Sequence, residues 1–192
     1  MFTSRRIATM GGDKFRDEYS LAFDGTDDFI DVGTGVNSAF DTDFTISAWV
    51  KQTSAANAVI FSANDSTSDG VRLVMGSSQN LKIRLNGAMP VTTSSPCALG
   101  VWNHVVGAYS DTNNVATLYV NGVLKLSESQ DRDIGGMQLA TIGTRSYEKG
   151  ALVWNGSMSE IAIYDTALSA SQVKTLYNGR EPYNHKEGIA TG

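Results

Sequence analysis

Four aspartates gather at one turn near the start of the chain, and their side chains could bind a metal ion. Asp24, Asp27, Asp28 and Asp31 surround a glycine-containing segment between two apolar runs. Hard cations such as Ca²⁺ are bound by several carboxylate and carbonyl oxygens around one point. The same residues also favour an Asx-type turn, in which the carboxylates accept backbone hydrogen bonds and stay in solvent. The residues alone leave both interpretations open.

A second acidic group raises the question of catalysis. Glu128, Asp131 and Asp133 lie in a stretch rich in Ser, Gln, Arg and Gly. Paired carboxylates can cleave glycosidic bonds when they flank the scissile bond. Solvated loop charges are the better interpretation of this stretch. The chain has no H-E-x-x-H, G-x-S-x-G or P-loop pattern, and His185 has no evident partner. We therefore predict no catalytic residues and no enzymatic activity.

The histidine and the tryptophans of the apolar runs are better explained by architecture than by chemistry. His104 alternates with Trp102 and Val106, which predicts a hydrogen-bonded residue of a sheet. Trp49 and Trp154 also lie in strand-like segments, as Trp102 does. A tryptophan can stack on a sugar ring, but in such positions it is more often part of a core or a sheet face.

Composition and charge favour a single all-β domain and exclude several partners. The chain has 192 residues, with 41% hydrophobic and 18% charged residues, which suits one domain with short extensions. A net charge of −5 gives no basic footprint for nucleic acid and disfavours docking on an anionic membrane. Cys97 is the single cysteine, so no intrachain disulfide can form. Residues 1–18 do not resemble a signal peptide, and no segment is apolar enough to span a bilayer.

The central stretch 101–127 contains the strongest turn signal. Asn121-Gly122 separates two apolar runs and predicts a type I′ hairpin turn, because both central residues must adopt positive φ. With the preceding run 101–109, it predicts three neighbouring antiparallel strands. A regular hairpin would pair Val120 with Val123, Tyr119 with Leu124, and Thr117 with Leu126.

One short helix is predicted near the end of the chain. Ser169 is a suitable N-cap and Gln172 can complete a capping box. Leu168 and Val173 can form a hydrophobic staple, and Gly179 can end the helix. So short a helix needs a sheet to pack against. Trp49, on the more polar face of the run 44–51, indicates a sheet face that must be partly covered.

Short strands with turn signals at regular spacing predict an all-β fold. We expect a two-sheet antiparallel β-sandwich of the jelly-roll type with one short C-terminal helix. The domain would cover 19–178, between an N-terminal extension (1–18) and a C-terminal tail (179–192). No single ligand-binding residue can be assigned. The loops 64–70, 76–80 and 147–150 are the expected places for specificity, because loops on a rigid scaffold carry recognition.

Five stretches, in order, resemble the motifs of laminin-G-like domains with a concanavalin A-like jelly roll. They are Ser20–Val32, Phe44–Lys51, Gly100–Tyr109, Thr117–Val123 and Gly156–Tyr177. The resemblance covers roughly residues 19–178. It implies two antiparallel sheets, one of them concave, and a domain that binds glycans or proteins. Many members of the family also carry a Ca²⁺ ion at the edge of the sandwich.

The resemblance implies which residues would hold that calcium ion. In the family an Asp-Gly turn and an Asp-Glu pair of the closing strand approach each other. Here the turn is Asp24-Gly25 and the pair reads Ser159-Glu160, so the implied ligands are Asp24, Gly25 and Glu160. Because a hydroxyl replaces one carboxylate, the plain turn is the favoured interpretation and bound Ca²⁺ is the alternative.

The segment Leu176–Gly192 resembles segments that follow such domains in large structural proteins of marine bacteriophages. This resemblance implies a virion surface protein of the decoration, fibre or tail type, for which glycans are candidate ligands. Its neighbouring subunits would be contacted through the N- and C-terminal tails, since polar tails become ordered when they are tied down. The alternative is a carbohydrate-binding domain of a bacterial surface or secreted protein, in an extracellular or cell-surface location.

Overall fold

The computed structural model describes residues 20–63, 70–86, 91–94, 96–131 and 139–177. The predicted N-terminal extension and C-terminal tail lie outside the described residues, as do Asp133, His185 and nearly all of the loop 64–70. The boundaries of the domain and the contacts of the two tails stay predictions.

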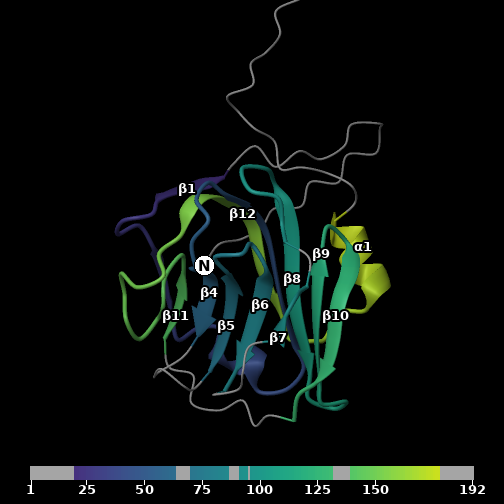
Figure 1. Ribbon diagram of the computed structural model, residues 1–192. Helices are drawn as coiled ribbons and strands as arrows, with labels where there is room; N and C mark the ends of the chain where they lie inside the picture. Colours follow the sequence, from purple (N-terminus) through teal and green to yellow (C-terminus); the bar gives the residue numbers. More distant parts are fainter. Residues whose placement is uncertain (1–19, 64–69, 87–90, 95, 132–138, 178–192) are drawn as a thin grey trace, which may run out of the picture.

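The fold is the predicted sandwich of two antiparallel sheets, each with six strands (Figure 1). Sheet A has the strand order β1-β12-β3-β8-β9-β10, and sheet B has the order β2-β11-β4-β5-β6-β7. The strands are β1 (Leu21–Asp24), β2 (Ile30–Gly33), β3 (Phe44–Gln52), β4 (Ala58–Ala63), β5 (Val71–Met75), β6 (Leu81–Leu85), β7 (Val91–Thr92), β8 (Asn103–Ser110), β9 (Val115–Val120), β10 (Val123–Ser129), β11 (Ala140–Ile142) and β12 (Asn155–Tyr164). The helices are the 3-10 helix η1 (Asn37–Phe40) and the α-helix α1 (Ala170–Tyr177).

The core lies between the sheets and follows the alternation of the strands. Every second residue of β3, β5 and β6 is buried in it, among them Ile46, Leu73 and Ile83. Phe40 of η1 closes one region of the core, with its ring centroid 5.6 Å from that of Phe61. Burial of each such side chain contributes about 1.5–3 kcal/mol. Consequently the alternate residues of the same strands must face outward.

The hairpin of β9 and β10 confirms the predicted turn and corrects one pairing. Asn121 and Gly122 have φ of 52° and 72°, as a type I′ turn requires. Val123 pairs with Val120, and Leu124 with Tyr119. The expected partnership of Thr117 with Leu126 is wrong. A β-bulge between Leu124 and Leu126 inserts one residue, so Leu126 pairs with Leu118, and Ser127 pairs with Thr117.

Helix α1 covers part of the outer face of sheet A, as the position of Trp49 predicted (Figure 1). The capping box is present: the backbone N–H of Ser169 donates to Gln172 Oε1 over 2.8 Å, and the backbone N–H of Gln172 donates to Ser169 Oγ over 3.4 Å. Leu168 and Val173, the predicted staple, belong to one buried apolar cluster with residues of β8 and β9. Tertiary packing therefore holds this two-turn helix in place.

Candidate functional site

The acidic turn forms, although with three of its four aspartates. One carboxylate oxygen each from Asp24, Asp27 and Asp28 lies within 4.8 Å of the others, and all three side chains are exposed. Asp24 Oδ1 accepts the backbone N–H of Thr26 at 2.7 Å, and Asp28 Oδ2 accepts that of Asp24 at 3.0 Å. These contacts form the Asx-type turn. Asp31 is not part of this group. It lies in β2 of the other sheet, where its carboxylate accepts hydrogen bonds from Gly33 and Lys149.

The structure does not bring Glu160 to Asp24 and Gly25. Asp24 is paired with Asn155 at the start of β12, and Gly25 packs on the Asn155 side chain. Glu160 lies further along β12, in the bulge between Ser159 and Ala162. At about 3.3 Å per residue, roughly 15 Å of strand separates Glu160 from Asn155. The calcium ligands implied by the resemblance are thus not gathered at one point, and a bound Ca²⁺ ion stays a prediction.

We expect calcium to have little effect on stability, because the acidic turn is closed by its own hydrogen bonds. The melting temperature in excess Ca²⁺ and in EDTA should agree within about 1 °C, whereas a site filled to ten times its Kd would add about 1.4 kcal/mol and roughly 3 °C. Scanning calorimetry is the measurement. A rise of several degrees that is lost in Asp27→Asn would contradict this expectation and establish a metal site.

His104 and the three tryptophans are architectural, as predicted. His104 is 2% exposed, and its Nε2 lies 2.9 Å from Ser47 Oγ on the neighbouring strand. Trp49, Trp102 and Trp154 are all buried. Trp49 stacks on Tyr177 of α1, so its ring is covered by the helix.

Two further side chains with potential chemistry differ in their surroundings. Cys97 is buried, and burial raises the pKa of its thiol to about 11, which lies far from the range of a reactive thiolate. Glu128 is an exposed residue near the end of β10. Asp131 follows that strand and is also exposed. In the part of the chain that the structure describes, Cys97, Glu128 and Asp131 belong to no cluster of potential metal ligands.

The outer face of sheet B presents a group of arginines. Arg72 of β5 and Arg84 of β6 are direct cross-strand partners, and both alternate with core residues. Arg145 joins them from the loop between β11 and β12. Burial is the main cause that lowers the pKa of Arg72; Tyr147 opposes it, and the nearby positive charges of Arg84 and Arg145 lower the pKa further. Arg72 is only 5% exposed. We call Arg72, Arg84, Arg145 and Tyr147 the arginine cluster.

Tyr147 sits among these guanidinium groups. Its ring centroid lies 5.8 Å from Cζ of Arg72 and 5.6 Å from Cζ of Arg145. Such distances allow cation–π attraction, which is worth about 0.5–2 kcal/mol and favours a fixed orientation of the guanidinium planes. Arg145 also donates to Glu148 at 2.9 Å. The tyrosine and the glutamate together position this arginine over the sheet.

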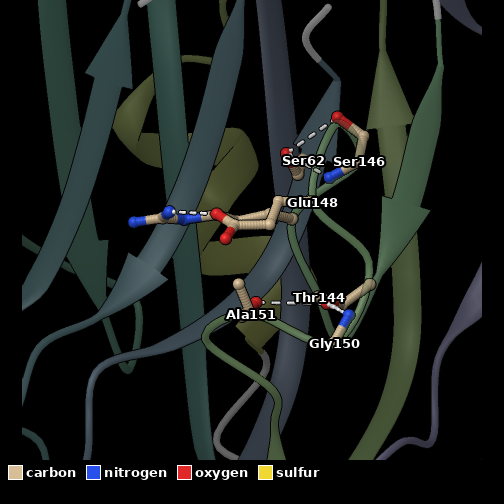
Figure 2. Close-up of polar contacts among 7 residues, drawn as sticks. Ser62, Thr144, Ser146, Glu148, Gly150 and Ala151 are labelled. Carbon is tan, nitrogen blue, oxygen red and sulfur yellow. Dashed lines mark hydrogen bonds and ion pairs between the residues drawn. The ribbon is translucent and has the colours of Figure 1, made fainter. Parts of the chain in front are cut away.

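The loop that carries Arg145 and Tyr147 is fastened to β4 and to itself (Figure 2). Ser146 Oγ lies 3.2 Å from Ser62 Oγ, and the backbone N–H of Ser146 also donates to Ser62. Thr144 Oγ1 accepts the N–H of Gly150 at 3.0 Å and donates to the carbonyl of Ala151 at 3.1 Å. The loop is therefore held rigidly, which suits a recognition surface.

A salt bridge extends this surface toward β2. Lys149 Nζ lies 2.6 Å from Asp31 Oδ2 and 5.5 Å from the ring centroid of Phe29. The hydrogen bond from Lys149 lowers the pKa of Asp31, with a smaller contribution from the N–H of Gly33. The ion pairs Lys149–Asp31 and Arg145–Glu148 both involve a residue of this loop.

Replacing Thr144 by valine should loosen this loop. The isosteric change removes both hydrogen bonds of a buried hydroxyl and leaves the N–H of Gly150 and the carbonyl of Ala151 with fewer partners. We expect the free energy of unfolding to fall by about 2 kcal/mol. Urea denaturation would measure it, with the exposed Thr112→Val as the matched control. Equal stability of the two variants would show that the hydroxyl does not fasten the loop.

Sequence reasoning located this site only in part. The loop 147–150 was an expected place for specificity, and the structure sets it beside the arginine cluster. The arginines were missed. Alternation within the runs 71–75 and 81–85 does indicate that Arg72 and Arg84 face outward, so that signal was available. The approach of Arg145 depends on how β11 pairs with β4, which no local pattern reports.

The class of protein follows from comparison with known families. A family model described as Laminin_G_3, concanavalin A-like lectin/glucanases superfamily, matches residues 24–174. This match covers most of the chain, so the protein belongs to that family, as its motifs predicted. No curated protein matches the chain. Among the described residues, no helix has the length and apolar character needed to cross a membrane.

Solved structures share the fold at low sequence identity. CBM40 of the Ruminococcus gnavus IT-sialidase, bound to α2,3 sialyllactose, is 17% identical with a TM-score of 0.67, over 83% of this chain and 98% of that chain. A heptameric SAP-like pentraxin from Limulus polyphemus is 21% identical with a TM-score of 0.64, over 82% and 81% of the two chains. The receptor binding domain of a botulinum neurotoxin mosaic serotype C/D is 18% identical with a TM-score of 0.62, over 84% and 42%. These similarities establish the fold alone.

Proposed function

We propose that the protein is a non-enzymatic carbohydrate-binding domain, and that it binds glycans on the outer face of sheet B beside the loop 144–151. The arginine cluster carries this proposal. It offers oriented hydrogen-bond donors and an aromatic ring on a rigid scaffold, which is the combination that fixes a polar ligand in place. The CBM40 structures with bound α2,3 and α2,6 sialyllactose support the view that this fold can serve as a glycan-binding domain.

The carboxylates of this face support binding in preference to catalysis. Asp31 and Glu148 are each engaged by a cation at 2.6 Å and 2.9 Å. A glycosidase needs one carboxyl group as acid and a second as nucleophile or base on either side of the scissile bond. Groups that are already held in ion pairs are poorly suited to those roles.

A glycan array followed by NMR titration would test the proposal. A competable hit should perturb the amide signals of the loop 144–151 and leave those of α1 unchanged. Tyr147→Ala should weaken binding, while Tyr119→Phe on the other sheet should not. Glycan binding whose signals map to sheet A would contradict the proposed location. Release of new reducing ends from a bound glycan would contradict the non-enzymatic role.

The resemblance of the tail supports a finer proposal. We infer that the domain belongs to the surface of a phage particle, as a decoration, fibre or tail component, and contacts host-surface or environmental glycans. The tails that would reach neighbouring subunits lie outside the described residues. Electron microscopy of purified particles that lack the protein is the direct measurement. Particles with unchanged surface features would exclude this structural role.

The competing proposal is a carbohydrate-binding domain of a bacterial surface or secreted protein. The family and the arginine cluster support it equally. A monomer in solution that binds a glycan and is absent from purified particles would favour it over the virion role. In either proposal a bound Ca²⁺ ion, implied by the family resemblance, is the alternative to the plain turn, and the carboxylates of Asp24, Asp27 and Asp28 are its candidate ligands.

A further inference from the structure

Three arginines gather on sheet B of an acidic chain. The protein has a net charge of −5, yet Arg72 and Arg84 stand directly opposite each other on adjacent strands. Like charges in that position destabilise a sheet. Arg145 adds a third positive charge beside them, and its charge is one of the causes that lower the pKa of Arg72. The ring of Tyr147 lies beside Arg72 and Arg145 and offsets part of this repulsion, and an anion bound at the arginines would offset more of it.

The cluster also has hydrogen-bonding capacity to spare. The Nε atoms of Arg84 and Arg145 are buried and have no hydrogen-bond partner among the described residues. Arg145 has one carboxylate partner, Glu148, whose side chain is 58% exposed. Arg84 has no ion-pair partner among the described residues. A buried donor without a partner costs free energy, and an anion that reached these donors would recover it.

The chemistry of a ligand for Arg84 and Arg145 follows from the guanidinium group. Arginine presents planar, paired donors that match the two oxygens of a carboxylate or the oxygens of a sulfate ester. The donors are pre-organised, because Tyr147 stacks near Arg72 and Arg145 and the loop is tied to Ser62. A rigid set of donors loses little entropy when it binds.

We propose that Arg84 and Arg145, with the positive charge of the buried Arg72 beside them, bind the acid group, a carboxylate or a sulfate ester, of an anionic sugar residue. Glu148 is the internal counter-ion that the ligand displaces from Arg145. The inference rests on the proposed glycan-binding function and names the class of glycan. Glu148 therefore competes with the ligand. When no ligand is bound, its carboxylate pairs with Arg145, and removing the charge of Glu148 should make Arg145 available to the ligand.

Calorimetric titration of the full chain would test the inference at low salt. The probes are 3′-sialyllactose, an oligogalacturonate, a sulfated oligosaccharide and neutral lactose. At least one acidic probe should bind tenfold or more tightly than lactose, and its affinity should fall as salt is raised. The acidic probe that binds best distinguishes carboxylate from sulfate recognition.

Variants then assign the binding to the cluster. Arg84→Gln should weaken binding of the acidic probe by about tenfold to a hundredfold, the range of a lost charge-assisted contact, and Arg84→Lys should fall between it and the wild type. Glu148→Gln should strengthen binding several-fold. The matched controls are Lys174→Gln on α1 and Asp165→Asn, which change charge by the same amounts away from the site. Circular dichroism and melting temperature verify folding.

The outcomes separate the two proposals. If lactose binds as tightly as the acidic probes, the anion site is excluded while glycan binding stands. If an acidic probe binds but Arg84→Gln and Glu148→Gln leave its Kd unchanged, the cluster is not the site. If none of these probes and no glycan of the array binds, both proposals fail.

Discussion

Gly156→Ala is expected to lower the free energy of unfolding by about 4 kcal/mol or more, which is a large part of the stability of an ordinary domain. Gly156 has φ of 132°, a conformation that side chains rarely adopt. An added Cβ would clash with the carbonyl oxygen of Lys51 and would lie 3.1 Å from Cα of Gln52. These are backbone atoms of β3, which is hydrogen-bonded on both sides by β12 and β8, so they cannot move away.

Gly100→Ala is the matched control for this prediction. Gly100 also has a positive φ, of 74°, but nothing lies within 4 Å of its added Cβ. Its cost should be the backbone strain alone, about 1–2 kcal/mol. Urea denaturation followed by tryptophan fluorescence would measure both variants. Equal losses would show that the close approach of β12 to β3 does not determine the effect.

The local elements of this fold could be predicted from the sequence because their signals are local. The run 44–51 lies within β3, and Asn121-Gly122 forms the expected turn. The capping residues Ser169 and Gln172 mark the start of α1. Each of these features depends on the preferences of neighbouring residues, which the sequence displays directly.

The register after the Asn121-Gly122 turn shows where local reasoning stops. Periodicity alone assumes a regular hairpin, and the bulge near Lys125 shifts every later pair by one residue. Gly122 adds a second, non-local requirement. A Cβ there would lie 2.8 Å from Cδ1 of Tyr177, so α1 packs directly on the turn. No pattern within residues 117–127 reports that contact.

The candidate site could be predicted even less well, because it is assembled from distant segments. Ser62 and Ser146 meet only because β4 pairs with β11, which places Thr141 beside Ser62. The loop after β11 then returns across β4, where the backbone N–H of Val59 donates to the carbonyl of Leu152 at 2.8 Å. The aspartates of the acidic turn are neighbours in the sequence, so a local pattern predicts that they lie together. The arginines that gather in space are spread over three elements.

The stability of the protein should fall steeply in mild acid because of His104. Burial lowers the pKa of His104 from 6.5 to about 4. Its Nε2 contacts Ser47 while its buried Nδ1 has no partner among the residues that the structure describes, so a proton at Nδ1 would have no acceptor there. Above pH 6.5 the ring is neutral in both states and the full stability is present. As the pH falls from 6.5 to about 4, the unfolded chain takes up a proton that the folded chain excludes.

Because of this difference in proton uptake, the free energy of unfolding should fall by about 3 kcal/mol between pH 6.5 and pH 4, at about 1.4 kcal/mol per pKa unit. Asp31 acts in a separate range, because its lowered pKa makes its contribution disappear only below its unfolded value of 3.8. Urea denaturation at pH 7, 6, 5 and 4.5 is the measurement, and His104→Gln is the comparison. Glutamine can still bond to Ser47 but does not titrate, so its curve should be flatter in this window.

Protonation of His104 should also lower the local stability of helix α1. Tyr177 stacks on His104 with ring centroids 6.0 Å apart, and Trp49 completes the stack, with 5.3 Å to His104. A charged imidazole in this water-poor layer would favour opening of the helix that covers it. Amide hydrogen exchange corrected for its intrinsic pH dependence should show less protection in α1 at pH 5 than at pH 7, and the change should be absent in His104→Gln. Identical pH profiles for the two proteins would mean that other groups, and not His104, set the acid sensitivity.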